Sequence, residues 1–366
     1  MKIGILTFHR ALNYGAVLQC YALFVFLRQM GHDVEVIDYR PWCIEKDRKD
    51  FDWRSFKTRS FLQKLKYISL FPSRSVFRRK SSKVFDVFLK SNLKFSCPVV
   101  TARDIPSYYD AIIFGSDQIW SPIICKELNA IYYGQFTKGS TRFLSYAASL
   151  EGYKDFTPQQ WDTIASYLNT FDAISVREKS VRDALATHLS HQVEWVVDPT
   201  LLIDSALLKN LVKVKPAQRY VLLFTAQDGT MPYHIAQHIA KENKCGVIRM
   251  RTSARLNWRN KEKNVHHIYA ASPERFVEYI SNATCVVTNS FHATAISLQL
   301  KKDFVAVECK HPNRIVDLLH SLDLTDRYVT TIDDLNHVKS IDYEKVHSRI
   351  KDLSSASRTY LTMHLQ

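Results

Sequence analysis

Short apolar segments alternate with helical segments along most of this sequence, and this alternation limits the fold more than any other feature. Near the start we predict a buried strand at 2–8, a helix at 15–30 and a second strand at 33–39. Strand, helix and strand in this order form a βαβ unit with parallel strands. The pattern restarts after a turn at Asp198-Pro199-Thr200, so we expect an α/β protein with two successive doubly wound halves.

The remaining predicted elements repeat this alternation through both halves. We predict further strands at 111–114, 143–146, 173–176, 194–197, 220–224, 246–250, 285–288 and 304–307, and helices at 159–168, 181–188, 231–242, 293–300 and 314–322. A chain of 366 residues is about twice the length of a typical domain. Because 46% of the residues are hydrophobic and 23% are charged, the composition excludes a mainly disordered chain. We therefore predict two packed cores with a boundary near residue 200.

The net charge of +14 comes mainly from one segment, residues 45–94, which we call the basic insert. It contains fifteen Lys or Arg and five Asp or Glu, with aromatic residues such as Trp53, Phe61 and Phe71 between them. This mixture is typical of helices on anionic membrane surfaces, but also of a helical subdomain that packs its aromatics on the first core. We expect the insert to lie away from the chemistry. No nucleic-acid-binding motif accompanies the charge, so we expect no nucleic acid partner.

The seven cysteines show no CxxC spacing, and the chain opens without a secretory signal pattern. We therefore expect reduced thiols in a cytoplasmic protein, without disulfides or a zinc cluster. No segment approaches 18 uninterrupted apolar residues, so we expect no membrane span. His234 and His238 are four residues apart on a predicted helix, but no third ligand is evident, so we predict no catalytic metal.

In doubly wound halves, ligands bind in the loops that follow the carboxyl ends of the strands. The first such loop contains Asn13, Tyr14 and Gly15 and leads into a helix whose first N–H groups suit an anion or a polar ligand. Gly15 permits close approach to the backbone. The alternative is an ordinary turn with Asn13 as the helix cap.

The loop after the predicted strand 111–114 combines a carboxylate, an amide and an indole. Asp117 is a candidate to bind a hydroxyl or accept its proton, and Trp120 is a candidate sugar platform. Ser116 and Gln118 stand beside them. The alternative is a solvated Asp117 that caps the next turn.

Two further strand ends carry cationic candidates. Arg177 follows the strand at 173–176, where its guanidinium could reach a phosphate or a carboxylate, or else pair with Glu178. Asn289 and Ser290 precede a helix of small residues, and His292 lies in its first turn. A histidine at a helix start is also often structural.

Taken together and in order, these loops resemble the polysaccharide pyruvyl transferase family. The matching segments are 13–19 (Asn-Tyr-Gly-Ala-Val-Leu-Gln), 115–120 (Gly-Ser-Asp-Gln-Ile-Trp), 145–149 (Ser-Tyr-Ala-Ala-Ser), 175–178 (Ser-Val-Arg-Glu), 198–200 (Asp-Pro-Thr) and 288–292 (Thr-Asn-Ser-Phe-His). The resemblance covers residues 1 to about 330, apart from the basic insert. It implies a GT-B-like fold with two Rossmann-like domains, at 1–200 and 201–335, that face each other across a cleft. It also implies that residues 336–366 form a helix that returns to the first domain.

The resemblance implies a transferase that moves the enolpyruvyl group of phosphoenolpyruvate onto two sugar hydroxyls. The product is a cyclic pyruvate ketal, phosphate is released, and no cofactor or metal is required. The expected acceptor belongs to an exopolysaccharide, a capsule or a lipid-linked precursor, so the enzyme would work in the cytoplasm, at the inner face of the membrane.

On this resemblance we assign roles to the candidate residues. Arg177 and the amides after Ser290 would clamp the donor, and His292 would act as the acid or as a cationic phosphate ligand. Asp117 would act as the base or orient a hydroxyl. The expected substrate-binding residues are Asn13, Tyr14, Gly15, Ser116, Gln118, Trp120, Asn289 and Ser290.

Ser290 departs from some members of the family, which have Arg at this position. We expect another arginine to supply the missing charge, and the candidates are Arg251, Arg255, Arg259 and Arg314. Two other functions fit the same fold: a glycosyltransferase that uses a nucleotide sugar, and a non-catalytic protein that binds glycans or phosphorylated ligands.

Overall fold

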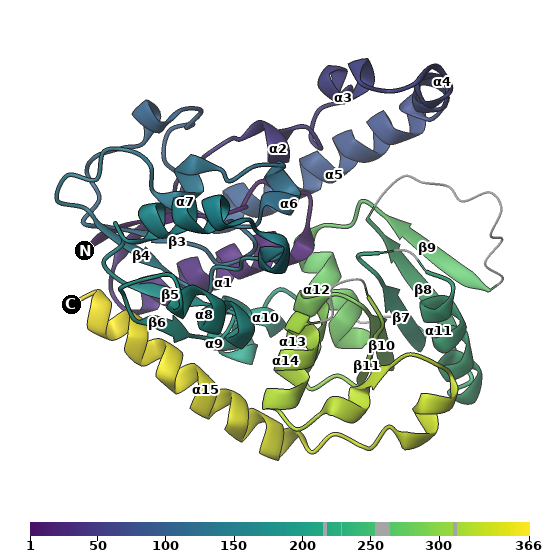
Figure 1. The fold of residues 1–366 in the computed structure, drawn as a ribbon. Helices are drawn as coiled ribbons and strands as arrows, with labels where there is room; N and C mark the ends of the chain where they lie inside the picture. The colour runs from purple at the N-terminus through teal and green to yellow at the C-terminus, as the bar shows by residue number, and fades with distance from the viewer. Residues whose placement is uncertain (215–217, 228, 253–263, 310–312) are drawn as a thin grey trace.

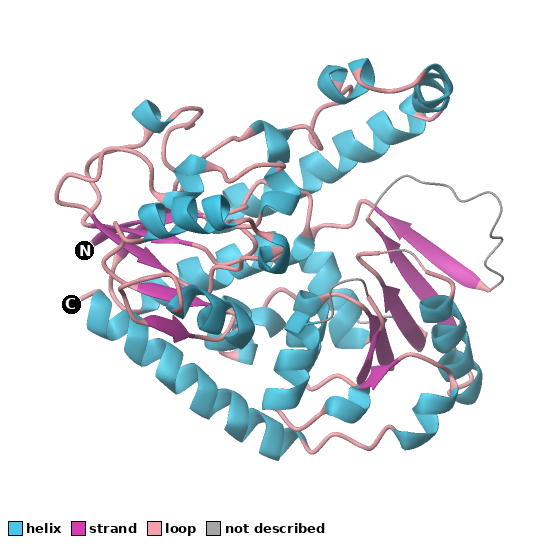
Figure 2. Cartoon of the chain, in the orientation of Figure 1, coloured by secondary structure: helices cyan, strands magenta, loops and turns pink. Residues whose placement is uncertain are grey.

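The computed structural model of the chain describes residues 1–214, 218–227, 229–252, 264–309 and 313–366. Two parallel β-sheets, each packed against helices, lie side by side (Figures 1 and 2). This architecture confirms the predicted fold class. The expected boundary near residue 200 stays a prediction.

The first sheet consists of short, almost fully buried strands. Its order is β2 (Asp33–Val36), β1 (Lys2–Leu6), β3 (Ala111–Phe114) and β4 (Arg142–Ser145), all parallel. Isolated bridges such as Leu144 to Ala173 link β4 to a parallel pair, β5 (Ile174–Val176) and β6 (Val193–Trp195). The strand order reverses between β1 and β3, so the loops after these two strands flank the position where such sheets bind ligands.

The second sheet has six parallel strands in the Rossmann order. The order is β9 (Val265–Tyr269), β8 (Gly246–Arg251), β7 (Tyr220–Phe224), β10 (Cys285–Thr288), β11 (Phe304–Val307) and β12 (Tyr328–Val329). Counted along the chain, this is the order 3-2-1-4-5-6 of dinucleotide-binding domains. Its reversal lies between β7 and β10, and the loops after these strands face those of the first sheet.

Helices cover the sheets and connect the two halves. They are α1 (Tyr14–Gln29), α2 (Trp42–Glu45), α6 (Pro122–Cys125), α7 (Pro158–Leu168), α8 (Lys179–Ala186), α9 (Pro199–Leu202), α10 (Ser205–Lys209), α11 (Met231–Glu242), α12 (Pro273–Asn282), α13 (Phe291–Gln299), α14 (Asn313–Ser321) and α15 (Tyr343–His364). The last helix, α15, runs back along the first half (Figure 1). There Tyr360 donates a hydrogen bond to the Ser145 carbonyl at 2.8 Å, and the Val197 amide donates to Ser357 Oγ at 3.0 Å.

The two halves share one hydrophobic core around α1. Tyr14, in the first turn of α1, stacks on Phe276 of α12 with ring centroids 4.6 Å apart. Its hydroxyl donates a hydrogen bond to the Ala271 carbonyl at 3.2 Å. The same core continues through Leu222 in the second sheet and Ile350 in α15. The contact between the two halves is therefore part of this shared core.

The basic insert forms three helices: α3 (Trp53–Lys57), α4 (Phe61–Ser69) and α5 (Phe71–Asn92). Phe85, Phe88 and Leu89 of α5 are buried in the shared core and anchor the insert. The helices α3 and α4 and the start of α5 extend from the body of the molecule (Figure 1). The aromatic residues therefore divide between the anchored end and the projecting end. The packing interpretation holds for the anchored end, and the membrane-surface interpretation stays a prediction for the projecting end.

The cysteine prediction was wrong at two positions. Cys43 and Cys125 form a disulfide between α2 and α6, with Cα atoms 4.8 Å apart, while the other five cysteines are free. These helices meet although 82 residues separate the two cysteines, and sequence spacing does not reveal such a contact. Cysteine content therefore no longer supports a cytoplasmic location. None of the helices in the described ranges is long and apolar enough to cross a bilayer.

Candidate functional site

A cavity of about 810 Å³ opens where the loops of the two sheets face each other. Its walls come from the loops of both halves and from the basic insert. The charged and polar lining residues include Asn13, Asp117 and Gln118 from the first half, Asn289, Ser290, His292 and Arg314 from the second half, and Lys46, Asp47, Asp52, Ser55, Arg59, Tyr67, Arg74 and Arg78 from the insert. The insert therefore lies next to the cavity that most of the candidate loops face, since α3, α4 and α5 all contribute lining residues, while the expectation that it lies away from the chemistry stays a prediction.

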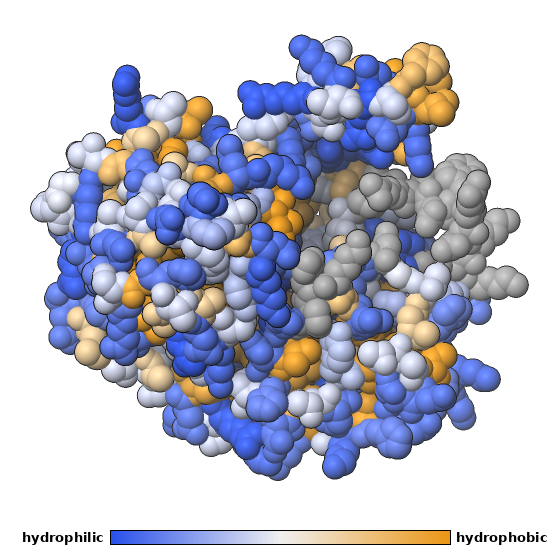
Figure 3. Space-filling model, in the orientation of Figure 1, coloured by the Kyte–Doolittle hydropathy of each residue, from blue (hydrophilic) through white to orange (hydrophobic). Residues whose placement is uncertain are grey.

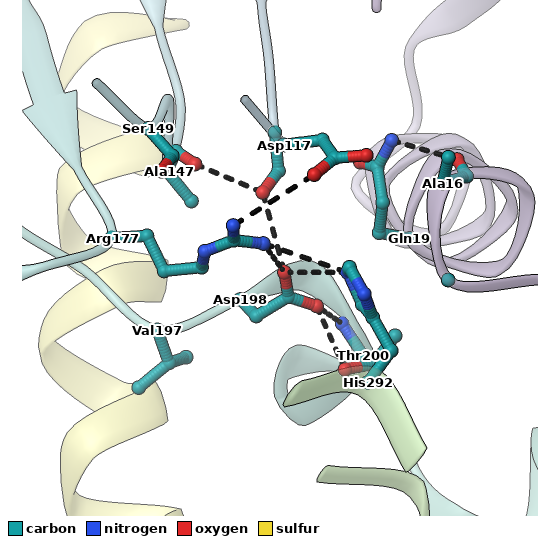
Figure 4. A network of polar contacts seen from close by, with 12 residues as sticks. Ala16, Gln19, Asp117, Ala147, Ser149, Arg177, Val197, Asp198, Thr200 and His292 are labelled. Carbon is teal, nitrogen blue, oxygen red and sulfur yellow. Dashed lines mark hydrogen bonds and ion pairs between the residues drawn. The ribbon is translucent and has the colours of Figure 1, made fainter. Parts of the chain in front are cut away.

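Beneath the cavity floor, one guanidinium is surrounded by three carboxylates. Figure 4 shows two of them, those of Asp117 and Asp198, beside Arg177. Arg177 Nη1 donates to Asp198 Oδ2 at 2.9 Å, and its Nε donates to Glu178 Oε1 at 3.2 Å. Nη2 has no hydrogen-bond partner and lies 3.8 Å from Asp117 Oδ1. The Arg177 side chain is only 2% exposed and does not line the cavity. The structure thus gives the alternative that paired Arg177 with Glu178, and it adds Asp198, while the role of Arg177 in holding the donor stays a prediction.

Arg177 and Asp198 hold each other in the ionised form. Burial disfavours the charge of Arg177, but the carboxylates of Glu178 and Asp198 outweigh it and raise the pKa of the guanidinium. Burial would raise the pKa of Asp198, but the ring of His292 and the guanidinium of Arg177 lower it well below its usual range. Three carboxylates and one guanidinium leave an excess of negative charge, and His292 is the basic group that joins them at the cavity wall.

His292 lies between the cluster and the first helix. Its Nε2 is 3.5 Å from both Asp198 Oδ2 and Arg177 Nη1, and the ring forms part of the cavity wall. On the other side, a Cβ added to Gly15 would lie 2.1 Å from His292 Nδ1. The close approach that glycine permits here is therefore made by the imidazole. This contact corrects the prediction that Gly15 contacts the substrate.

The first loop uses its polar groups for helix capping. Asn13 Oδ1 accepts hydrogen bonds from the amides of Gly15 at 2.9 Å and Ala16 at 3.3 Å, as the capping alternative predicted. Asn13 still lines the cavity. The prediction that Tyr14 binds substrate was wrong, because its ring and hydroxyl are buried against α12 and the loop before it.

The second loop places Asp117 in the cavity and Trp120 in the core. Asp117 has φ +79°, a left-handed conformation that is uncommon outside glycine, and it turns the chain at the end of β3. Trp120 is fully buried and donates a hydrogen bond to the Tyr132 carbonyl at 2.9 Å. The prediction of a sugar platform at Trp120 was therefore wrong. Gln118 lines the cavity and donates to the carboxylate of Glu151.

Ser116 is also buried and contributes to the cluster from below. Its hydroxyl lies 2.9 Å from the Ala147 carbonyl and 3.3 Å from Asp198 Oδ2. Full burial excludes direct contact with a ligand in the cavity, so the prediction that Ser116 binds substrate was wrong. Its hydroxyl instead donates a hydrogen bond that helps to hold the Asp198 carboxylate in place.

The loop after β10 forms part of the cavity wall that belongs to the second half. Asn289 accepts a hydrogen bond from the Ala226 amide at 2.7 Å and donates one to the Gln227 carbonyl at 3.0 Å. Its amide therefore joins the loops after β7 and β10 while one edge lines the cavity. Ser290 caps α13, because its Oγ accepts from the Ala293 amide at 3.4 Å.

One of the four arginines proposed to supply the charge missing at Ser290 lies at the cavity. Arg314 lines the cavity, with Nη2 3.4 Å from Glu151 Oε2. Arg251 does not line it, and its Nε donates to His267. Arg255 and Arg259 lie outside the described residues.

Sequence reasoning missed Asp198 and the cavity-lining cations of the insert. Asp198 belongs to a segment that was interpreted as a turn and as part of the family resemblance but was given no role in the site, although an Asp before Pro-Thr is also a helix-cap pattern. It does cap α9, with Oδ1 accepting from the Thr200 amide at 3.0 Å, and its Oδ2 holds Arg177. In the described ranges, no group of three or more His, Cys, Asp or Glu side chains is arranged to hold a metal ion.

Comparisons with known proteins agree with this fold. A family model described as polysaccharide pyruvyl transferase matches residues 13–311. UDP-GlcNAc 2-epimerase from Neisseria meningitidis, solved bound to UDP-GlcNAc, aligns over 100% of both chains at 14% identity with a TM-score of 0.51. This likeness shows a GT-B-like arrangement of two Rossmann-like domains. Two further solved structures align with the chain. UDP-N-acetylglucosamine 2-epimerase from Rickettsia bellii aligns at 13% identity over 97% of this chain and 87% of that chain, with a TM-score of 0.48. The glycosyltransferase SnogD from Streptomyces nogalater aligns at 11% identity over 100% of this chain and 99% of that chain, with a TM-score of 0.46. No curated protein matches the sequence.

Proposed function

The chain belongs to the polysaccharide pyruvyl transferase family, and on this premise we propose that it forms a pyruvate ketal on a sugar, with phosphoenolpyruvate as the donor. The observation that carries the proposal is that Asp117 and His292 both line the cavity and both lie within 4 Å of Arg177, while cationic side chains of the insert and of α14 line the same cavity. No resident cofactor or metal takes part in the proposed reaction.

The cations of the cavity suit the charges of the donor. Phosphoenolpyruvate carries a phosphate and a carboxylate, and an enclosed anion requires cationic or N–H partners. Arg59 and Arg78 of the insert and Arg314 of α14 line the cavity from two sides. We assign the donor anions to these side chains in place of Arg177.

The proposed reaction needs one proton donor and one proton acceptor near the same carbon. A proton added to the methylene carbon of the donor leaves an oxocarbenium-like carbon, which a sugar hydroxyl attacks while losing its own proton. Phosphate then leaves, and a second hydroxyl attacks the same carbon. One of the two hydroxyl protons replaces the proton given to the methylene, and the other leaves with the phosphate. We assign the donation to His292 and the acceptance to Asp117.

Arg177 is a positioning residue in this proposal. It touches Asp198 and lies within 4 Å of both Asp117 and His292, so it fixes the distance between the proposed base and acid. Lysine at this position would keep the charge but could not bridge these groups with one planar fork. Arg177→Lys should therefore reduce turnover with little change in the KM for the donor.

The proposed acceptor is a sugar of a surface glycan or of its lipid-linked precursor. Because phosphoenolpyruvate is a cytoplasmic metabolite, we place the reaction in the cytoplasm. Thermal stabilisation by phosphoenolpyruvate, but not by nucleotide sugars, would support the donor assignment, since a ligand that binds the folded state raises its stability. Stabilisation by a nucleotide sugar alone would favour a glycosyltransferase.

Phosphate release tests the assigned roles. With phosphoenolpyruvate and a glycan acceptor, His292→Ala and Asp117→Asn should each lose about 100-fold or more in turnover. His234→Ala, at an exposed position on α11, is the matched control and should retain it. Undiminished phosphate release in the His292→Ala protein would contradict the assignment.

A second set of variants tests whether the cations of the insert bind the donor. Arg59→Gln and Arg78→Gln should raise the KM for phosphoenolpyruvate, because both side chains line the cavity. Arg79→Gln removes an equal charge from the same helix as Arg78, but Arg79 pairs with Asp50 outside the cavity. An equal change in all three proteins would indicate a general charge effect instead of a defined site.

A further inference from the structure

The outer face of α4 is apolar although it faces solvent. Phe61 is 75% exposed, Leu62 77%, Leu65 50% and Ile68 54%. Leu62, Leu65 and Ile68 are spaced three residues apart, and Phe61 lies four residues before Leu65, so the four side chains form one stripe along the helix. Trp53 of the neighbouring helix α3 is 63% exposed. Figure 3 shows the hydrophobic surface at this projecting end of the insert, next to strongly hydrophilic residues.

The charges beside this stripe have one sign. Residues 51–83 contain ten Lys or Arg and one acidic residue, Asp52. Asp52 is buried and caps α3, where its Oδ1 accepts from the Ser55 amide at 3.0 Å. The exposed charges next to the stripe, Lys57 and Lys66 among them, are therefore not neutralised by exposed carboxylates in this segment.

The same helices face the cavity on their inner side. Tyr67 is buried between α4 and its neighbours, and it lines the cavity together with Ser55 and Arg59. The insert is thus a thin wall with the cavity on one side and the apolar stripe on the other. Whatever covers the stripe also lies next to the cavity.

We propose that this outer face docks on an anionic lipid bilayer, with the apolar stripe of α4 and Trp53 in the headgroup region and the flanking lysines on lipid phosphates. Apolar side chains bordered by cations are the combination that anionic interfaces bind. A second copy of the chain is disfavoured, because a symmetric contact would bring the same basic rims together. The proposal does not depend on the chemistry of the cavity.

Vesicle co-sedimentation tests the proposal with the full-length protein. Binding to vesicles of phosphatidylcholine mixed with phosphatidylglycerol should exceed binding to phosphatidylcholine alone, and salt should weaken it. Leu62→Ser combined with Leu65→Ser should lower the partition coefficient by about tenfold or more. Lys57→Gln combined with Lys66→Gln should lower it by roughly tenfold on the anionic vesicles alone.

A matched control separates this patch from general surface hydrophobicity. Val100 and Val214 are 62% and 53% exposed and lie outside the insert. Val100→Ser combined with Val214→Ser should bind vesicles like the unmodified protein. Thermal melting should show the same stability for all variants, because every changed side chain is on the surface.

Three results would overturn the proposal. The first is the absence of binding to anionic vesicles, which would leave an acidic protein as the partner. The second is equal binding by the α4 variant and the unmodified protein. The third is a change in the molecular mass of the particle in lipid-free solution when Leu62 and Leu65 are replaced, which would show that the stripe joins copies of the chain. Phosphate release from phosphoenolpyruvate, measured with a water-soluble acceptor, should be unchanged in the α4 variant, so failure of docking and failure of the proposed reaction are distinguishable.

Discussion

Replacement of Gly15 by alanine is the most direct test of how the two halves form the site. The added Cβ would lie 2.1 Å from His292 Nδ1, 2.4 Å from its Cγ and 2.8 Å from its Cβ. The imidazole would have to retreat by about 1 Å or more to reach ordinary contact distance. It cannot do so freely, because its Nε2 lies 3.5 Å from Asp198 and Arg177 in a buried cluster.

The expected cost follows from this overlap. An extra methyl group in a packed region costs about 1 to 3 kcal/mol, while alanine in a helix gains up to about 1 kcal/mol over glycine. Gly15→Ala should therefore lower the free energy of unfolding by about 1 to 2 kcal/mol. If His292 acts on the donor, a displacement of about 1 Å should also lower turnover by about 100-fold.

A double-mutant cycle isolates the contact. His292→Ala removes Nδ1 and Cγ, the two atoms nearest the new methyl group, and leaves only the 2.8 Å contact with Cβ, so the Gly15→Ala substitution should cost less in that background. Denaturant unfolding of the four proteins should give a coupling energy of about 1 to 3 kcal/mol. Gly246→Ala is the control, since an added Cβ there meets nothing within 4 Å. Additive effects within about 0.5 kcal/mol would refute the contact.

Three further substitutions test positions where the structure departs from, or adds to, the sequence interpretation. Trp120→Phe should destabilise the protein by about 2 kcal/mol because it leaves the buried Tyr132 carbonyl without its donor, and thermal melting should show this while sugar affinity is unchanged. Tyr14→Phe should cost about 1 kcal/mol through the lost hydrogen bond to Ala271 and leave the KM for the donor unchanged in steady-state assays. The folded-state pKa of Asp198 is lowered, so its stabilisation is present above its unfolded pKa of about 4 and is lost as the pH falls towards the folded value. Melting temperatures between about pH 6 and pH 3 should therefore fall less for Asp198→Asn than for the unmodified protein.

The fold was predictable because its signals are local. The apolar run at 2–8 and the helical pattern at 15–30 correspond to β1 and α1, because buried parallel strands and their connecting helices carry these patterns in their own residues. The same alternation predicted the strands β7, β8, β10 and β11 of the second sheet, while their order in the sheet comes from the structure. The sequence does not reveal Val265–Tyr269 as strand β9 as clearly, since two of its residues are exposed and the apolar pattern is weak.

The site was predictable in its loops but not in the direction of each side chain. Asp117 and Trp120 belong to one short segment, yet one reaches the cavity and the other the core, because the left-handed turn at Asp117 redirects the chain. Arg177 stands where a ligand-binding arginine is expected, and only the tertiary structure shows the carboxylates of Asp198 and Glu178 around it. Long-range contacts of this kind leave no periodic signal in the sequence.

The shared core around α1 limits how chains of this kind can change. Tyr14 of α1 is buried against Phe276 of α12. If the second halves of two relatives were exchanged, α1 of one protein would pack against α12 of the other, and the two surfaces would not be complementary. A half expressed alone would expose the apolar surface of that junction and would be prone to aggregate. Substrate specificity can therefore change more easily by substitutions in the cavity loops and in α3 and α4, which line the cavity but lie outside the shared core.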